Sequence, residues 1–287
     1  MDLLACIEHQ HEVYAEKDYT ILKDPRVLLN LYNQERRFTP NKNYFLEVQT
    51  EIQPFMRQVV TTWMHEVCEE QMCEDQVFPL AVNCMDRFLC LCPIKRNQLQ
   101  LLGAVCLLIA SKLRSTNSFS MEILCAYTDY SVSHSAMVAW ELLVLSKLKW
   151  NVASITGFDY IDQIVEMFPW GAESNLLHRH ARTLVSISYT DSKLIKTPPS
   201  MIAAACLTSA IRGLRLRSTN QAVNDICSIA SIKISDLETV VRVVDEAVER
   251  SVPKSPPSTP EPEPKLQGYE SPQHGPNTPT EVENIYF

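Results

Sequence analysis

The stretch that most constrains the fold is residues 99–113, with the sequence LQLLGAVCLLIASKL. Residues 101–110 carry no charge, so a helix formed here is apolar on every side. Such a helix lies inside a bundle rather than on a surface. The small residues Gly103 and Ala104 let neighbouring helices come close, and the flanking sequence offers four amphipathic partners. The sequence therefore predicts a five-helix domain around this hub, with Lys112 at the exposed end of the hub.

A second all-round apolar segment, PPSMIAAACL, begins at residue 198. Because proline is tolerated in the first turn of a helix, this segment predicts another buried helix with its own ring of partners. We therefore expect an all-α protein with two tandem five-helix domains, at residues 23–152 and 153–252. The first domain includes an N-terminal helix that starts at Asp24-Pro25 and packs across it.

The two ends of the chain differ from these domains. Residues 1–22 are mostly polar and predict a flexible N-terminus. Residues 253–287 are rich in Pro, Ser, Thr and Glu, and they predict a disordered regulatory tail because they cannot bury enough apolar surface to fold. The tail holds four Ser-Pro or Thr-Pro dipeptides, each a candidate site for a proline-directed kinase, which begin at Ser255, Thr259, Ser271 and Thr278.

The N-terminal segment contains the pattern L-x-C-x-E, formed by Leu4, Cys6 and Glu8. Alternate residues of an extended peptide point the same way, so these three side chains share one face. Two apolar groups and a carboxylate on one face suit strand-like docking onto a partner groove. Five-residue patterns arise by chance, but the position of this one in an accessible end favours a binding role.

Composition excludes several classes of function. The formal net charge of −8 and the pI of about 5.4 argue against nucleic-acid binding, which depends on Lys and Arg neutralising phosphates. No apolar run reaches the roughly 18 residues of a membrane span, and the N-terminus lacks the features of a signal peptide. We therefore expect neither nucleic acid nor a membrane as a partner.

The chain also lacks the patterns of catalytic and metal sites. Its ten cysteines contain no C-x-x-C pair, and His65 with Cys68 falls short of the four ligands of a structural zinc site. The cysteines are expected to be reduced thiols that pack as small apolar side chains. No phosphate-binding glycine loop or catalytic motif is present. The sequence predicts a protein that is not an enzyme and holds no metal and no cofactor.

One apolar stripe precedes the hub. Met56, Val59, Val60 and Trp63 are spaced i, i+3, i+4 and i+7, which places them on one side of a helix. By itself this spacing favours packing in the core.

A carboxylate in an apolar setting, Glu141, marks a second point of interest. Val138, Leu145 and Leu148 lie on the same helical face, and a partly buried carboxylate without a partner costs several kcal/mol. Lys112 is the nearest suitable partner. From spacing alone two interpretations stay equal: an ion pair that only fixes two helices, or two charges that reach a surface groove and meet a second protein.

Four segments together resemble a known family. MRQVVTTWMHEVCEEQMCEDQVFPLAVNCMDRFL, LQLLGAVCLLIASKL, ELLVLSKLKWN and PPSMIAAA are similar to the cyclin box, and closely similar to that of the D-type cyclins. The resemblance runs from about Asp24 to about Gly213. It implies two tandem cyclin boxes and a regulatory subunit that binds and activates cyclin-dependent kinase 4 or 6, or an orthologue. That kinase then phosphorylates retinoblastoma-family proteins at the G1/S transition.

The resemblance also implies roles for particular residues. Lys112 and Glu141 match the pair that grips the kinase helix carrying its regulatory glutamate. A hydrophobic patch that docks substrates and Cip/Kip-type inhibitors through an Arg-x-Leu motif corresponds to Met56, Arg57, Val59, Val60, Trp63, Glu66 and Gln100. On this reading, part of the Met56 stripe is exposed.

The two ends match family motifs as well. Leu4, Cys6 and Glu8 resemble the retinoblastoma-binding motif. Thr278 resembles a phosphorylation site that prompts nuclear export and recognition by a ubiquitin ligase, so the family implies both a nuclear and a cytoplasmic location. One departure stands out: Ser115 replaces an acidic residue found in many relatives, which puts one contact to the kinase in doubt.

Two alternatives stay open at this point. A transcription-factor-type cyclin fold, like that of general transcription factor IIB, would call for a basic face and usually a zinc ribbon, and the chain lacks both signals. A viral cyclin derived from a D-type parent is the other alternative, which the two terminal motifs disfavour.

Overall fold

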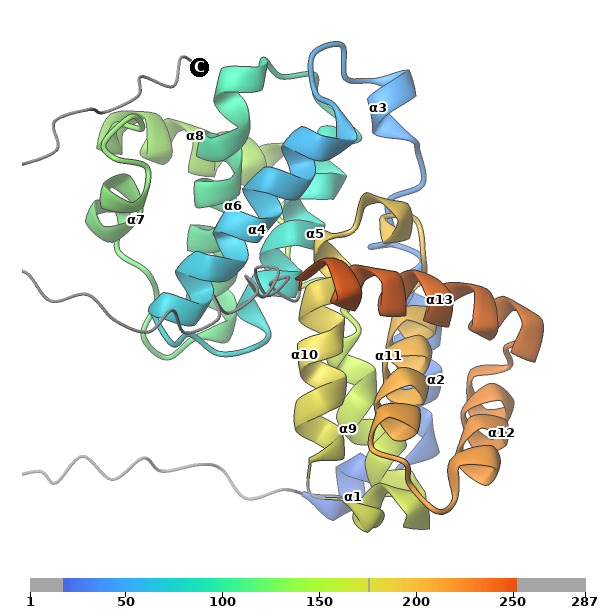
Figure 1. Cartoon of the computed structure of the whole chain (residues 1–287). Coiled ribbons are helices and arrows are strands. Elements are labelled where there is room, and N and C mark those ends of the chain that lie inside the picture. Colours follow the sequence, from blue (N-terminus) through green and yellow to red (C-terminus); the bar gives the residue numbers. More distant parts are fainter. Residues whose placement is uncertain (1–17, 175, 252–287) are drawn as a thin grey trace, which may run out of the picture. The chain divides into compact units, whose positions relative to one another are not determined.

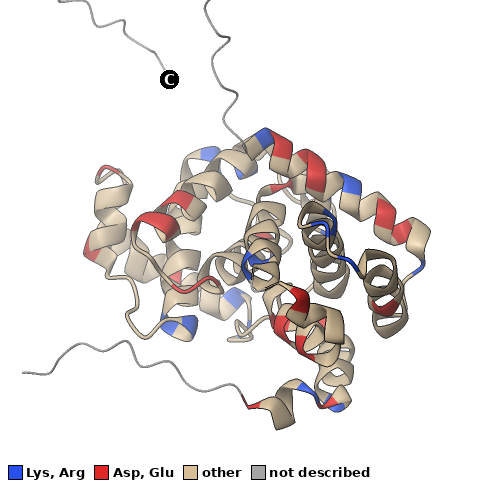
Figure 2. Cartoon of the chain, turned by 60° about the horizontal axis from the view of Figure 1, so that its bottom comes forward, with Lys and Arg blue, Asp and Glu red and all other residues tan. Residues whose placement is uncertain are grey.

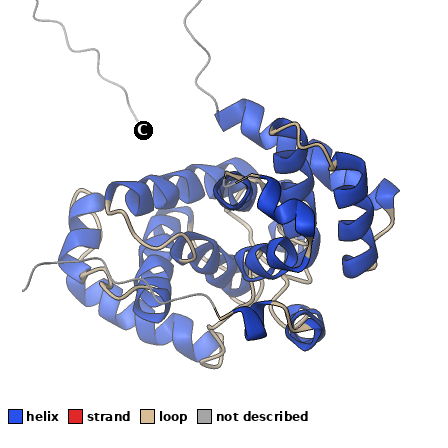
Figure 3. Ribbon diagram, turned by 90° about the horizontal axis from the view of Figure 1, so that it is seen from below, coloured by secondary structure: helices blue, strands red, loops and turns tan. Residues whose placement is uncertain are grey.

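The computed structural model describes residues 18–174 and 176–251, which are helical apart from their connections, with no strand in that part of the chain (Figures 1 and 3). The first half holds eight α-helices: α1 (Tyr19–Leu22), α2 (Pro25–Glu35), α3 (Tyr44–Glu47), α4 (Pro54–Glu70), α5 (Val77–Leu89), α6 (Leu99–Arg114), α7 (Met121–Tyr127) and α8 (His134–Lys147). The second half holds α9 (Phe158–Met167), α10 (Leu177–Thr190), α11 (Pro199–Gly213), α12 (Thr219–Ala230) and α13 (Ile234–Ser251). Three short 3₁₀ turns, η1 (Arg96–Gln98), η2 (Pro169–Glu173) and η3 (Ser192–Leu194), join them.

The hub predicted at residues 99–113 is helix α6, and the prediction is confirmed. Its residues from Leu102 to Ser111 are all buried, and α4, α5, α7 and α8 all contact it. Lys112 lies at the exposed end of the helix, as expected. A helix that is apolar all round is stable here because four other helices remove every side of it from water.

The second half repeats this plan. Helix α11 is buried from Ile202 to Thr208, and it contacts α9, α10, α12 and α13. In each of two sets of five helices, α4 to α8 and α9 to α13, four helices therefore surround a central apolar helix. The all-α fold with two tandem five-helix domains is confirmed.

Gly103 sets the distance between α4 and α6. A Cβ atom added at this glycine would lie 2.9 Å from Val60 Cγ1 and 3.2 Å from Met64 Sδ, closer than an unstrained contact allows. The sequence predicted such a close approach. It matters for function because Val60 also belongs to the stripe that faces outward from α4.

We expect Gly103→Ala to lower the free energy of unfolding by about 1–2 kcal/mol. Overpacking a core costs about 1–3 kcal/mol, and the better helix propensity of alanine returns at most about 1 kcal/mol. Urea unfolding followed by circular dichroism measures the change. A matched control is Gly213→Ala at the end of α11, where an added Cβ has no neighbour within 4 Å. A variant at Gly103 that is as stable as the parent would contradict the close approach.

Helix α2 differs from the expectation that it packs across the first domain. Its contacts are with α9 and α11 of the second set. The buried Glu35 carboxylate explains this placement, because Tyr160 Oη donates to it at 3.0 Å and Ser200 donates from both its backbone N, at 3.0 Å, and its Oγ, at 2.9 Å. The first set is reached by the segment after the helix, where Asn83 Nδ2 donates to the Phe38 carbonyl at 2.8 Å.

Side chains cap the N-terminal ends of two helices of the first half. Asp24 accepts from the backbone N of Arg26, with Pro25 as the first helical residue, and Ser120 accepts from the backbone N of Ile123 at the start of α7. Within residues 1–22, where the sequence predicts a flexible N-terminus, Tyr19–Leu22 form helix α1, capped by the side chain of Asp18. A single helical turn is too short to give a periodic pattern, so the sequence does not reveal it.

Several expectations concern residues that lie outside the described part of the chain. These are the motif of Leu4, Cys6 and Glu8, the site at Thr278, and the tail over residues 253–287. Among the described residues, no group of three or more His, Cys, Asp or Glu side chains is placed to hold a metal ion. None of the described helices has the length and apolar content that crossing a membrane requires.

Candidate functional site

The predicted partnership between α6 and α8 is present. Lys112 Nζ lies 2.6 Å from Glu141 Oε1, an ion pair that joins the last turn of α6 to the middle of α8. The lysine side chain is 46% exposed and the glutamate side chain 17% exposed. The two charges thus satisfy each other while the lysine still faces solvent.

Exposed apolar side chains surround this ion pair. Leu113 follows Lys112 on α6, and Val138 and Leu142 flank Glu141 on α8, each at least 45% exposed. Together with Lys112 and Glu141 they form what we call the Lys112–Glu141 face. Apolar side chains gathered around a charged pair on one surface are typical of protein–protein interfaces.

A second surface lies on α4. Val59 is 64% exposed, Met56, Val60 and Trp63 are each partly exposed, and the four follow one another along one side of the helix. We call these four residues the α4 strip. Trp63 is held in place by its Nε1, which donates to the Tyr127 carbonyl at 3.3 Å. Spacing alone favoured a core role for this stripe, whereas the resemblance favoured partial exposure, and the exposure is observed.

Two polar residues assigned to the same patch border the strip. Glu66 lies one helical turn beyond Trp63 and is exposed. Gln100 is partly exposed in the first turn of α6, the helix packed against α4. Both positions leave these side chains open to a partner on the α4 strip.

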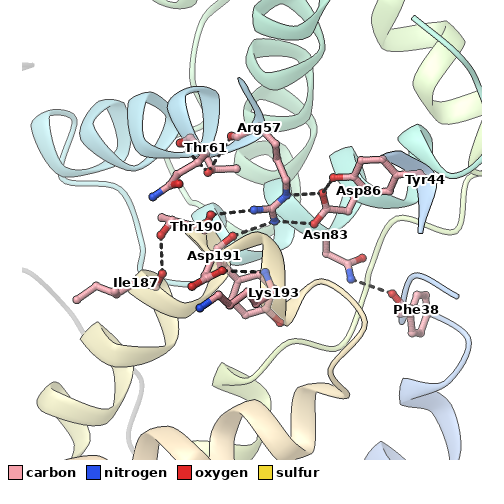
Figure 4. Close-up of polar contacts among 12 residues, drawn as sticks. Phe38, Tyr44, Arg57, Thr61, Asn83, Asp86, Ile187, Thr190, Asp191 and Lys193 are labelled. Atoms are coloured by element: carbon pink, nitrogen blue, oxygen red, sulfur yellow. Dashed lines mark hydrogen bonds and ion pairs between the residues drawn. The ribbon is translucent and has the colours of Figure 1, made fainter. Parts of the chain in front are cut away.

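Arg57 does not belong to this surface, which corrects the expectation that it forms part of the docking patch. Its side chain is 1% exposed. The guanidinium forms a two-pronged ion pair with Asp86, with Nε to Oδ1 and Nη2 to Oδ2 both at 2.8 Å (Figure 4). On the far side it donates to the carbonyls of Tyr189 and Thr190 at 2.9 Å. The residue therefore ties α4 and α5 to the end of α10.

The environment of Arg57 favours its charged form. Burial alone would lower the pKa of the guanidinium, but the adjacent Asp86 carboxylate raises it above its ordinary value. Tyr44 Oη completes the arrangement by donating to Asp86 Oδ1 at 2.8 Å, and burial raises the pKa of Tyr44 well above its usual range. Sequence reasoning missed this network. The signal that could have revealed it is Asp86, a carboxylate inside the apolar helix VFPLAVNCMDRFL, which requires a buried cation.

The segment after Lys112 departs from many relatives at Ser115. Its Oγ donates to the Asn117 carbonyl at 3.0 Å, so the hydroxyl stabilises the local turn. Arg114, next to it, donates to Gln76 Oε1 at 3.0 Å and lies 3.6 Å from Asp159. Both side chains have partners within the chain.

Comparisons with known proteins identify the family. The sequence matches the cyclin N-terminal domain over residues 26–153 and the cyclin C-terminal domain over residues 155–261. It is 48% identical over 217 residues to the G1/S-specific cyclin-D2 of Xenopus laevis, covering 75% of this chain and 74% of that protein. It is 40% identical over 293 residues to the G1/S-specific cyclin-D3 of Bos taurus, covering the whole of both. The chain is a D-type cyclin.

The fold agrees with this assignment. The crystal structure of a viral cyclin from herpesvirus saimiri superposes with a TM-score of 0.69 and 25% identity, covering 79% of this chain and 98% of that one. This D-type cyclin is accordingly a G1/S-specific regulatory subunit that binds a cyclin-dependent kinase and carries no catalytic groups of its own. Charges of both signs are spread over its helices (Figure 2).

Proposed function

We propose that this D-type cyclin binds and activates a kinase of the cyclin-dependent kinase 4 or 6 type through the Lys112–Glu141 face. The observation that carries the proposal is the ion pair of Lys112 and Glu141 in the middle of exposed apolar side chains. An ion pair that only joined α6 to α8 would not require exposed apolar side chains around it. This geometry favours the second of the two interpretations that spacing left equal.

The mechanism is allosteric. A rigid helical surface binds one face of the kinase and selects the arrangement in which a helical glutamate of the kinase pairs with its ATP-site lysine. The cyclin supplies binding energy that differs between the two kinase conformations, and the kinase supplies every catalytic group. The buried hub α6 suits this role, because four other helices pack against it and fix its position.

Reconstitution tests the proposal. The purified chain and a cyclin-dependent kinase 4 or 6 catalytic subunit are expected to elute together from a size-exclusion column. The mixture is expected to phosphorylate a retinoblastoma-family fragment at a rate far above that of the kinase alone. Failure to associate, or association without any gain in kinase activity, would contradict the proposal.

Further partners follow from the family resemblance. We assign the α4 strip, with Glu66 and Gln100, to docking of substrates and Cip/Kip-type inhibitors that carry an Arg-x-Leu motif. Retinoblastoma-family proteins are the proposed substrates, bound also through Leu4, Cys6 and Glu8. A ubiquitin ligase that reads phosphorylated Thr278 is the proposed route of destruction, with the protein moving between nucleus and cytoplasm.

Val59→Asp tests the α4 strip. We expect kcat/KM to fall by about tenfold for a substrate that carries an Arg-x-Leu motif and to stay unchanged for a short peptide without it, because a charge in an apolar docking surface costs about 1–3 kcal/mol. Gln58→Asp is the matched control, since Gln58 is exposed on α4 but lies on a different side of the helix. Equal losses for both substrates, or for both variants, would contradict docking on the strip.

A further inference from the structure

A depression of about 300 Å³ lies where three helices end, at the C-termini of α2, α5 and α8. Its lining includes neutral side chains but no described Asp or Glu. Five of its lining residues are cations: Arg36, Arg37, Arg87, Lys147 and Lys149. We call this depression the basic groove. Neither the proposed kinase contacts nor the α4 strip include any of these five residues.

Arg87 is the most constrained of the five. Its Nη1 donates to Ser154 Oγ at 2.8 Å, and its guanidinium carbon lies 5.2 Å from the centre of the Phe38 ring. No described carboxylate forms an ion pair with it, and partial burial lowers the pKa of its guanidinium below the ordinary value. A half-buried cation that is positioned by a hydroxyl and a ring, without a counter-charge, is suited to receive an anion from outside.

The turn after α8 sets the backbone position of Lys149. Lys149 and Trp150 both have positive φ angles, 53° and 59°, which non-glycine residues adopt only at a cost. Backbone hydrogen bonds from Lys149 N to Ser146 O at 3.0 Å and from Trp150 N to Leu145 O at 2.8 Å hold the turn. This turn places Lys149 in the lining beside Lys147.

The partial negative charges at the C-terminal ends of the three helices offset only part of the positive charge of the five side chains. Each helix C-terminus carries the equivalent of about −0.5 elementary charge, which favours nearby cations. Three such ends fall well short of balancing five unit positive charges. A group with more than one negative charge would be complementary to this set of cations.

The residue types narrow the choice of anion. Guanidinium groups present a planar fork that matches phosphate oxygens, and lysine adds point charges around it. A carboxylate balances a single cation, whereas a phosphorylated side chain carries about −1.5 to −2 charges and three acceptor oxygens. The net charge of −8 for the whole chain disfavours nucleic acid as the source of the phosphate.

We propose that the basic groove binds a phosphorylated serine or threonine side chain of a polypeptide. Arg87 supplies the guanidinium that Ser154 and Phe38 hold in place. Lys147 and Lys149 supply charge from α8 and its following turn, and Arg36 and Arg37 supply charge from the end of α2. The proposal concerns a surface separate from the Lys112–Glu141 face and holds whichever kinase this cyclin prefers.

Nuclear magnetic resonance of the full chain tests for the site directly. Inorganic phosphate is titrated at neutral pH, with ionic strength held constant by sodium chloride, while the Nε–Hε signal of Arg87 and the amide signal of Lys149 are followed. Saturable shifts of both signals are expected with phosphate, and much smaller ones with acetate at the same concentrations. Equal shifts with the two anions, or no shift of the Arg87 signal, would overturn the proposal.

A labelled peptide tests whether the basic groove binds a phosphorylated side chain that is part of a polypeptide. A fluorescent Gly-Ala-Gly-Thr-Pro-Gly-Ala peptide with phosphothreonine is expected to bind at least about tenfold more tightly than the unphosphorylated peptide, as charge-assisted hydrogen bonds imply. The exposed double variant Lys147→Glu/Lys149→Glu is expected to remove this preference. The matched control Lys42→Glu/Lys196→Glu reverses two exposed lysines of another depression and is expected to keep it. Loss of the preference in both double variants, or in neither, would overturn the proposal.

Discussion

Arg57→Met is expected to lower the free energy of unfolding by about 3–5 kcal/mol, because removing one partner leaves the other charge buried and uncompensated. Asp86, 5% exposed, would keep only the hydroxyl of Tyr44 as a close donor. The carbonyls of Tyr189 and Thr190 would lose their donor at the same time. For a folded part of this size, a loss of that order lowers Tm by about 10 °C.

Thermal unfolding followed by circular dichroism measures this change, and the chain offers a matched control. Arg26 forms an ion pair of the same residue types with Asp24, but its side chain is 85% exposed. We expect Arg26→Met to cost less than about 1 kcal/mol, as for surface ion pairs generally. Restoring most of the lost stability with Arg57→Met/Asp86→Leu would support the explanation by an uncompensated charge. A Tm for Arg57→Met within about 2 °C of the parent, the size of shift typical of a surface substitution, would contradict it.

Arg57→Met also tests the interface between the two sets of helices, α4 to α8 and α9 to α13. Arg57 on α4 reaches the end of α10, and other contacts between α10 and both α4 and α5 accompany it. We expect the single unfolding transition of the variant to be broader than that of the parent, because the two sets then support each other less. The site where a docking role was expected is, on this account, a structural tie that positions the α4 strip.

Local sequence patterns predicted the buried hub helix, the close approach at Gly103 and the ion pair between α6 and α8. The uncharged residues 101–110 predicted a buried central helix, and Gly103 predicted that a neighbouring helix comes close to it. The pairing of Lys112 with Glu141 was predicted because a carboxylate on an apolar face requires a cation, and Lys112 lies at the end of the hub helix. These inferences needed residue types and helical spacing alone.

Residue types and helical spacing did not predict which distant parts of the chain pack together. The family resemblance put Arg57 in the docking patch with the α4 strip. The direction of its side chain depends instead on partners such as Asp86 and Tyr189, which lie far apart in the sequence. Helix α2 was placed on the wrong set of helices for a similar reason. Its destination is decided by Glu35, whose partners Tyr160 and Ser200 lie more than a hundred residues away.

The second large effect is expected at the Lys112–Glu141 face. Lys112→Glu is expected to weaken kinase binding by at least about 30-fold, because truncating or reversing one charge of an interfacial pair costs about 2–5 kcal/mol. The variant is expected to be less stable than the parent, because Glu141, 17% exposed, loses its partner and gains a like charge beside it. It should still fold, since the side chain at position 112 is about half exposed and can turn toward solvent. Circular dichroism of the variant checks that the helices remain.

The charge swap Lys112→Glu/Glu141→Lys separates the two roles of this pair. The swapped side chains can still form an ion pair between α6 and α8, so stability should return to near that of the parent. A kinase with a separate contact to each of the two charges would still bind the charge-swapped chain weakly. A pair that serves only to join two helices would instead allow the swapped chain to bind normally.

The most direct test of the account is the Kd between the kinase catalytic subunit and three forms of this cyclin: the parent, Lys112→Glu and the charge swap. Isothermal titration calorimetry on matched, folded samples provides all three values. We predict that both variants bind at least about 30-fold more weakly than the parent, although the swap restores stability. A charge-swapped chain that binds the kinase as tightly as the parent would contradict the claim that this surface is read by the kinase.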